Sequence, residues 1–233
     1  MTSVIDHLLS GELTVSGRLV DASNAPLYAE CNYLDVVMPV IYKPVAGERP
    51  LWDFPDGNLA QREYAAYLVS EISGWKVVPP TVLREGPFGV GMVQQWINLD
   101  ESVDLAMYYR ENNENLRRMA LFDAVVNNTD RKIGHLLPTT EGLLLGCDHG
   151  VTFHAEDKLR TVIWQFADSQ LTSAEQQTLQ ELTLNLKADP SLLTSLITEA
   201  EFDALILRIE RLLTTGTFPL PSEEWPAVPW PPF

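Results

Sequence analysis

The sequence predicts an α+β fold in two parts, a strand-rich first part followed by a helical second part. Residues 13–43 are rich in β-branched and aromatic residues, which favour strands. From residue 172 onward the apolar residues mostly recur at helical spacing. The change in character near residues 94–100 predicts a hinge, with a cleft between the two parts where ligands tend to bind.

The first part is expected to contain strands and one helix. The strands are expected at 13–20, 26–32, 35–44, 77–85 and 90–97, with a turn of Asp21, Ser23 and Asn24 after the first of them. The helix is expected at residues 59–73, because its apolar residues form one stripe and Gly74 supplies a stop.

The second part is expected to be mainly helical. Residues 102–127 carry an apolar stripe and predict one helix, and residues 127–153 predict loops and short strands. Two later helices are expected to begin at capping boxes: Thr172 with Glu175, and Thr198 with Glu201. The proline-rich segment 219–233 cannot form regular helix or sheet. We expect its aromatic residues to pack on the helical part, with a partner-binding polyproline segment as the alternative.

Composition and charge exclude several classes of function. The chain has 16 basic and 32 acidic residues and a net charge of -16, which disfavours binding to nucleic acid or to anionic lipid. No apolar run approaches the roughly 20 residues that span a bilayer, and the N-terminus lacks a secretory pattern, so we expect a cytoplasmic protein. Cys31 and Cys147 belong to no CxxC or His/Cys cluster, which leaves a structural zinc site without ligands.

Lys43 and Glu63 are candidates for a buried ion pair. Lys43 ends a hydrophobic strand, and a lysine that pointed inward there would need a partner. Glu63 lies in the middle of the only helix expected in the first part, among large apolar residues. Taken alone, the two residues are better explained as unrelated surface side chains.

Two aspartates stand in more specific surroundings. Asp130 begins a short charged turn, with Arg131 and Lys132, between two segments that read as buried. Asp148 ends an apolar run, and a carboxylate in that place needs a metal, a cation or hydrogen bonds. Phosphoryl transfer requires such groups, namely a cation on the phosphates, hard oxygen ligands for a metal and an acid near the attacking hydroxyl.

Several segments, taken in order, resemble the phosphatidylinositol 3-/4-kinase-like group of atypical kinases in its bacterial (actinobacterial-type) form. They are VIYKP, QREYAAY, VGMVQQWI, NNTDRKIGHLL and CDHGV, and the similarity covers residues 13–155. The resemblance implies a two-lobed protein-kinase-like fold. Its strand-rich N-lobe would be residues 1–97, and its helical C-lobe would be residues 98–233, including the proline- and tryptophan-rich tail.

The resemblance also implies a role for each residue. Lys43 would hold the phosphates, with Glu63 as its helix partner, and Asp130 would position or deprotonate the acceptor hydroxyl. Lys132 replaces the family's histidine and would act on the transferred phosphate as a point charge. The residues implied in nucleotide binding, besides Lys43, are Ser23 and Asn24 over the phosphates and Gln94, Gln95 and Trp96 beside the adenine.

The implied metal ligands are Asp148 and His135. His135 stands where the family usually has a metal-binding asparagine, and imidazole suits Mn²⁺ better than Mg²⁺. The turn 21–26 contains no glycine, whereas family members more often cover the phosphates with a glycine-containing loop. Both departures leave a nucleotide-binding pseudokinase, a regulatory or binding module, open as an alternative.

The expected function is therefore ATP-dependent phosphotransfer with Mg²⁺ or Mn²⁺. The acceptor would be a hydroxyl of a protein, of a small molecule or of the chain itself, whereas the net charge disfavours a lipid. A kinase fold that binds the nucleotide in reverse would transfer an adenylyl group instead, and only the product distinguishes these two enzymes.

Overall fold

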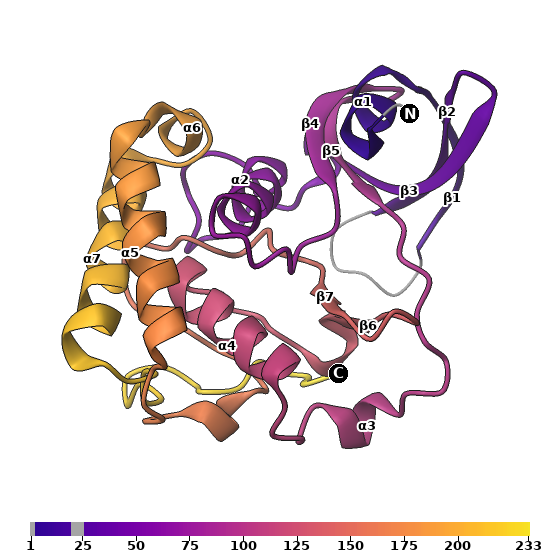
Figure 1. The fold of residues 1–233 in the computed structure, drawn as a ribbon. Helices are drawn as coiled ribbons and strands as arrows, with labels where there is room; N and C mark the ends of the chain where they lie inside the picture. The colour runs from indigo at the N-terminus through magenta and orange to yellow at the C-terminus, as the bar shows by residue number, and fades with distance from the viewer. Residues whose placement is uncertain (1–2, 20–25) are drawn as a thin grey trace.

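The computed structural model describes residues 3–19 and 26–233. Within these residues, antiparallel strands form a five-stranded sheet in the order β1-β2-β3-β5-β4 (Figure 1). Its strands are β1 (Glu12–Arg18), β2 (Leu27–Tyr33), β3 (Val36–Pro44), β4 (Thr81–Gly86) and β5 (Gly89–Gln95). The strand predictions are confirmed, except that β4 begins only after the two prolines of 77–85.

Two helices accompany the sheet. The helix α2 (Leu59–Ile72) agrees with the prediction and starts at Asn58, whose side chain accepts a hydrogen bond from the Gln61 N–H. The helix α1 (Val4–Ser10) was not predicted from the sequence. It begins with a capping box, and its buried Leu8 joins the apolar cluster between this helix and the sheet.

The rest of the chain, all of it described by the structure, contains five α-helices and a short hairpin, joined by long irregular segments. Its helices are α3 (Leu105–Tyr108), α4 (Glu114–Val126), α5 (Ser173–Ala188), α6 (Ser191–Thr194) and α7 (Glu199–Thr215), and its short hairpin is β6 (Leu136–Pro138) with β7 (Leu144–Gly146). Both predicted capping boxes are present, at the starts of α5 and α7. The single helix expected at 102–127 is wrong, because Asn113 caps a new helix by accepting from the Leu116 N–H.

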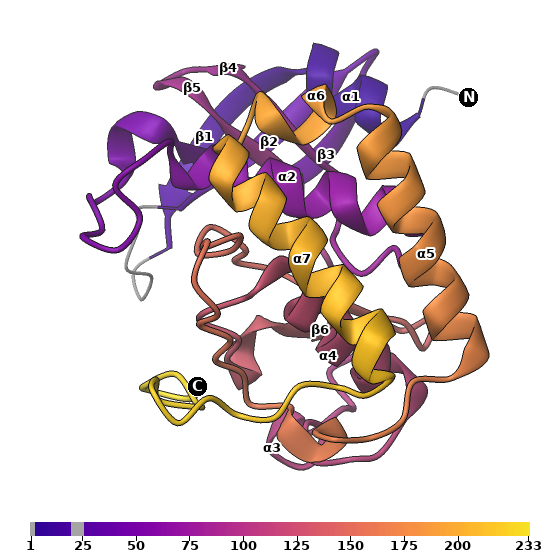
Figure 2. The same cartoon turned by 90° about the vertical axis from the view of Figure 1, so that its left-hand side faces the viewer.

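The helix α2 joins the two parts of the molecule. In Figure 1 it lies between the sheet and the pair α5 and α7, and Figure 2 shows α5 and α7 crossing in front of it. Its residues Ala65, Ala66 and Val69 belong to the large apolar cluster formed with α4, α5 and α7. The predicted α+β fold is confirmed, while a boundary between residues 97 and 98 stays a prediction. No helix among the described residues is long and apolar enough to cross a membrane.

The C-terminal segment, residues 219–233, follows the surface of the helical part without regular structure (Figure 2). Pro229 is buried and Trp225 half-buried, whereas Trp230 is 89% exposed and Phe233 is 63% exposed. The expectation that its aromatic side chains pack on the helical part is therefore met only in part.

Candidate active site

Lys43 is bound to two carboxylates. It lies near the end of β3, and its Nζ is 2.5 Å from Glu63 Oε1 and 2.7 Å from Asp148 Oδ1. Burial alone would lower the pKa of Lys43, but the two carboxylates outweigh burial and raise it well above the ordinary value. Lys43 is therefore a fixed cation held between the sheet, α2 and the segment after β7.

Glu63 is supplied by α2 and is only 1% exposed. Besides Lys43, it accepts a hydrogen bond of 2.9 Å from the His149 N–H. Burial raises the pKa of Glu63, and the attraction of Lys43 opposes that shift. The N-terminus of α2 is anchored as well, since the Glu48 carboxylate accepts from the Leu59 and Ala60 N–H groups. The buried ion pair considered from the sequence is present, and it excludes the explanation as unrelated surface side chains.

The turn that carries Asp130 follows α4 directly. Asn127 ends α4 in a left-handed conformation with φ 52°, which asparagine tolerates. The next residue, Asn128, accepts a 3.0 Å hydrogen bond from the Asp130 N–H. Lys132 Nζ lies 3.1 Å from Asp130 Oδ2, as its proximity in sequence suggested. Burial raises the pKa of Asp130, with Lys132 opposing, so its carboxylate is a better proton acceptor than an exposed aspartate.

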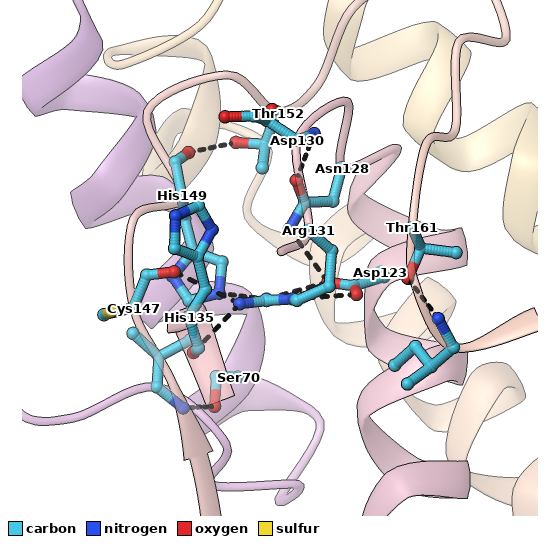
Figure 3. A network of polar contacts seen from close by, with 12 residues as sticks. Ser70, Asp123, Asn128, Asp130, Arg131, His135, Cys147, His149, Thr152 and Thr161 are labelled. Carbon is cyan, nitrogen blue, oxygen red and sulfur yellow. Dashed lines mark hydrogen bonds and ion pairs between the residues drawn. The ribbon is translucent and has the colours of Figure 1, made fainter. Parts of the chain in front are cut away.

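Arg131 ties this turn to the segment that carries Asp148 (Figure 3). Its guanidinium binds the Asp123 carboxylate, and both side chains are completely buried. The same guanidinium donates to the Cys147 carbonyl at 3.1 Å and to His149 Nε2 at 2.7 Å. A Cβ atom on Gly146 would lie 2.9 Å from Arg131 Nη1, so any larger residue there would force the guanidinium to shift.

Asp148 projects from a left-handed backbone with φ 61°. The neighbouring Lys43 is the main cause of its pKa lying far below the ordinary value, so Asp148 is ionised at neutral pH. His135 Nε2 lies 3.5 Å from Asp148 Oδ2. Burial lowers the pKa of His135 to about 4, so its imidazole is neutral at pH 7 and has a lone pair to offer.

Asp148 and His135 together offer an oxygen and a nitrogen donor to a divalent ion that arrives with a nucleotide. Among the described residues, no group of three or more His, Cys, Asp or Glu side chains is arranged to hold a metal alone. A site with one or two protein ligands suits Mg²⁺ or Mn²⁺ bound mainly through substrate phosphates. The donor set therefore fits a nucleotide-borne ion better than a structural one.

A cavity of about 630 Å³ opens beside these residues. Lys43, Glu63, Asp130, Lys132 and Asp148 all line it, so the structure brings together five of the predicted site residues. His135 does not line the cavity, but it lies next to Asp148, which does. A volume in this range is typical of small-ligand sites.

The three residues predicted to lie beside the adenine do not line the cavity. Gln94 is 4% exposed and donates from its side chain to Thr81 Oγ1 at 2.8 Å. Trp96 packs edge-to-face on Tyr28, with ring centroids 5.4 Å apart. Neither of them nor Gln95 lines the cavity, so adenine binding by these residues stays a prediction. Ser23 and Asn24 lie outside the described residues.

Two residues of the site had no assigned role in the sequence analysis. Arg131 was part of the charged turn, but its burial was unexpected because a run of charges is usually solvated. Asp123 lies in the apolar stripe of α4, and a lone acid among apolar residues is the sequence signal that could have indicated a buried partner.

Solved structures with a similar fold include kinases. The Golgi casein kinase bound to Mn and ADP matches with a TM-score of 0.59 and 14% identity over 91% of this chain and 74% of that chain. Another structure of the Golgi casein kinase gives a TM-score of 0.57 and 13% identity over 91% and 73% of the two chains. The Helicobacter pylori proinflammatory kinase CtkA gives a TM-score of 0.52 and 12% identity over 91% and 94%. At these identities the likeness establishes the fold alone.

No protein-family model matches the chain. One protein, however, is much more similar to this chain in sequence than the kinases above. Protein Rv2133c of Mycobacterium tuberculosis is 38% identical over 262 aligned positions, which cover 97% of this chain and 94% of that protein. Membership of the phosphatidylinositol 3-/4-kinase-like group stays a prediction. At this identity and coverage, the chain belongs to the family of Protein Rv2133c.

Proposed function

We propose that the chain is an ATP-dependent phosphotransferase with a hydroxyl acceptor, an atypical kinase that uses Mg²⁺ or Mn²⁺. The observation that carries this proposal is the contact of Lys43 with both Glu63 and Asp148, next to Asp130 in one cavity. A buried lysine between two acids, with a third acid close by, has the charges that phosphoryl transfer needs. The kinase-like fold supports the same proposal.

Each residue has a task in this mechanism. Lys43, held in place by Glu63, binds phosphate oxygens of ATP through its Nζ. Asp148, with His135 beside it, would hold the divalent ion, which neutralises charge on the phosphates. Asp130 accepts the proton of the acceptor hydroxyl while the acceptor oxygen bonds to the γ-phosphorus and the bond from that phosphorus to the β-phosphate oxygen breaks. Lys132 neutralises charge on the transferred group.

Intact-mass analysis after incubation with ATP and Mn²⁺ or Mg²⁺ tests this function. Wild type is compared with Asp130→Ala, and Asp203→Ala, an exposed position on α7, is the control. A phosphate-sized gain in mass in wild type and in Asp203→Ala, with no gain in Asp130→Ala, would support a self-phosphorylating kinase. An adenylate-sized gain would instead identify adenylyl transfer.

If the mass of the chain does not change, external acceptors are tested next. ADP release is then measured with panels of small hydroxyl compounds and of proteins, again with Asp130→Ala beside wild type. Release that depends on Asp130 supports the proposal. If no acceptor stimulates release while Mn²⁺-ATP still raises the melting temperature, the chain is a nucleotide-binding pseudokinase and the proposal fails.

A further inference from the structure

The cavity beside Lys43 extends well beyond the residues that handle phosphate. Its outer part, which we call the outer pocket, is bounded by residues 44–54, by Lys158 and Arg160, and by Trp225 and Trp230 of the C-terminal segment. Asp130 lines the same cavity. A molecule in the outer pocket would therefore approach the residue that is proposed to accept the acceptor's proton.

The C-terminal segment is firmly attached at this place. The Ile133 N–H, three residues after Asp130, donates to the Pro232 carbonyl at 2.9 Å. The Ala227 carbonyl accepts from the Thr161 N–H at 3.0 Å and from the Trp164 indole N–H at 2.8 Å. The bond to Ile133 attaches the segment to the residues that follow Asp130, and the segment's Trp225 and Trp230 form part of the cavity wall.

Lys158 joins the two sides of the outer pocket. Its Nζ lies 4.4 Å from the ring centroid of Trp225 and 5.6 Å from that of Trp52, which belongs to the loop on the other side. The ammonium also pairs with Glu156, whose side chain is 66% exposed. The contacts of one cation with two indoles hold the loop and the C-terminal segment on either side of the opening.

Two large aromatic side chains at this opening remain in solvent. Trp52 is 82% exposed and Trp230 is 89% exposed, and both line the cavity. Indole rings offer a wide apolar face on which the ring of a ligand can lie, and burying that face is favourable. The outer pocket is therefore suited to a ligand with a ring.

The outer pocket is less acidic than the chain as a whole. The chain carries a net charge of -16, yet the outer pocket has three basic residues, Arg49, Lys158 and Arg160, and two acids, Glu48 and Asp53. Glu48 is occupied by the two N–H groups at the start of α2. With Glu156, which pairs with Lys158, the acids and bases at this pocket are equal in number, so an anionic ligand is repelled far less there than by the acidic chain as a whole.

We propose that the outer pocket binds the acceptor, and that the acceptor is a small hydroxyl compound with an anionic group and a ring. This proposal rests on the proposed phosphotransferase function. The ring lies against Trp52 and Trp230, the anionic group meets Lys158 and Arg160, and the hydroxyl points inward to Asp130. The confined volume, closed on one side by the C-terminal segment, favours a small molecule over a folded protein.

Binding of 8-anilinonaphthalene-1-sulfonate tests the pocket without requiring catalysis, because this dye combines rings with one sulfonate. We expect one saturable site on the full chain, with an affinity at least tenfold lower in Lys158→Gln and in Trp230→Ala. Lys187→Gln and Phe88→Ala are matched controls, since both positions are exposed and neither lines the cavity. Circular dichroism and melting curves establish that each variant is folded.

The outcomes separate this inference from the proposed function. Equal dye affinity in all variants, or no saturable binding, would overturn the inference even if ATP were turned over. Loss of dye binding in the two pocket variants supports the pocket, whether or not phosphoryl transfer is found.

Kinetics then test the assignment to the acceptor. ADP release is measured with a panel of sugar phosphates, hydroxybenzoates and their neutral counterparts, and with folded proteins. We expect an anionic ring compound to be the acceptor, with KM at least tenfold higher in Lys158→Gln and kcat within about twofold of wild type. A neutral or protein acceptor, or a KM unchanged in Lys158→Gln, would overturn the assignment.

Discussion

Arg131 and Asp123 form an ion pair in which neither side chain is exposed to solvent. The pair connects α4 to the turn after Asp130, and Arg131 continues to the Cys147 carbonyl and to His149 (Figure 3). Burial lowers the pKa of His149 far below its ordinary value, so the ring accepts the arginine N–H as a neutral imidazole. Two of the candidate catalytic residues, Asp130 and Asp148, are thus positioned through one buried guanidinium.

Replacing Arg131 by methionine should therefore damage both stability and activity. Removing one partner of a buried pair leaves the other charge uncompensated, which costs about 3–5 kcal/mol of unfolding free energy. Chemical denaturation measures this loss. Arg211→Met is the matched control, because that arginine also pairs with an aspartate but is 57% exposed, and such a pair contributes at most about 1 kcal/mol. Similar losses in the two variants would contradict the structural role of Arg131.

Asp148→Asn should abolish the rise in melting temperature caused by Mn²⁺-ATP, since an amide cannot balance the charge of a metal ion. The measurement is a thermal shift with Mn²⁺-ATP against Mn²⁺ alone. Asp168→Asn is a close control, because Asp168 is exposed and has the same left-handed backbone, with φ 59° against 61° for Asp148. A shift in Asp148→Asn equal to that of wild type would remove Asp148 from the metal site.

Lys43→Met should reduce phosphoryl transfer by at least about 100-fold while weakening nucleotide binding less, because its cation acts mainly on the phosphates. It should also destabilise the chain, since Glu63 is left buried without its cation. The double variant Lys43→Met/Glu63→Gln should recover much of that stability but none of the activity. Wild-type turnover in Lys43→Met, measured by ADP release, would exclude Lys43 from the reaction.

The sequence predicted what depends on local pattern. Strand composition placed the sheet, and capping boxes located the starts of α5 and α7. Local signals were also misread: Asn113 has the chemistry of an N-cap, yet the periodicity of 102–127 suggested a helix that ran through it. The helix α1 was missed although Ser3 and Asp6 have the capping-box arrangement.

Contacts between residues that are distant in the sequence were harder to predict than helices and strands. The contact of Lys43 with Glu63 was predicted from the order of motifs, whereas the contact of Lys43 with Asp148 was not. The contact of Lys158 with Trp225 joins residues 67 positions apart (225 − 158), and no periodicity or motif relates them. Such contacts are decided by the path of an irregular segment, which composition alone does not determine.

Stability should fall as the pH drops below about 6.5, in part through His135. Its pKa is about 4 in the folded chain against 6.5 for an ordinary histidine, so between these values the unfolded chain binds a proton that the folded chain does not. The unfolding free energy should therefore be about 2 kcal/mol lower at pH 5 than at pH 7 from this residue, and nearly constant above pH 7. His149 acts in the same direction and steepens the loss.

Denaturant titrations from pH 4.5 to 8 check this, with wild type beside His135→Gln. Glutamine does not titrate, so the unfolding free energy of His135→Gln should depend less steeply on pH than that of wild type. The part of the pH dependence that comes from His149 should remain. Asp148 is ionised in the folded chain throughout this range, so it adds to the slope only near pH 4.5, where the unfolded chain begins to bind its proton, and it does so in both proteins. Parallel curves for the two proteins would show that His135 titrates normally in the folded chain, which would contradict its burial next to Asp148.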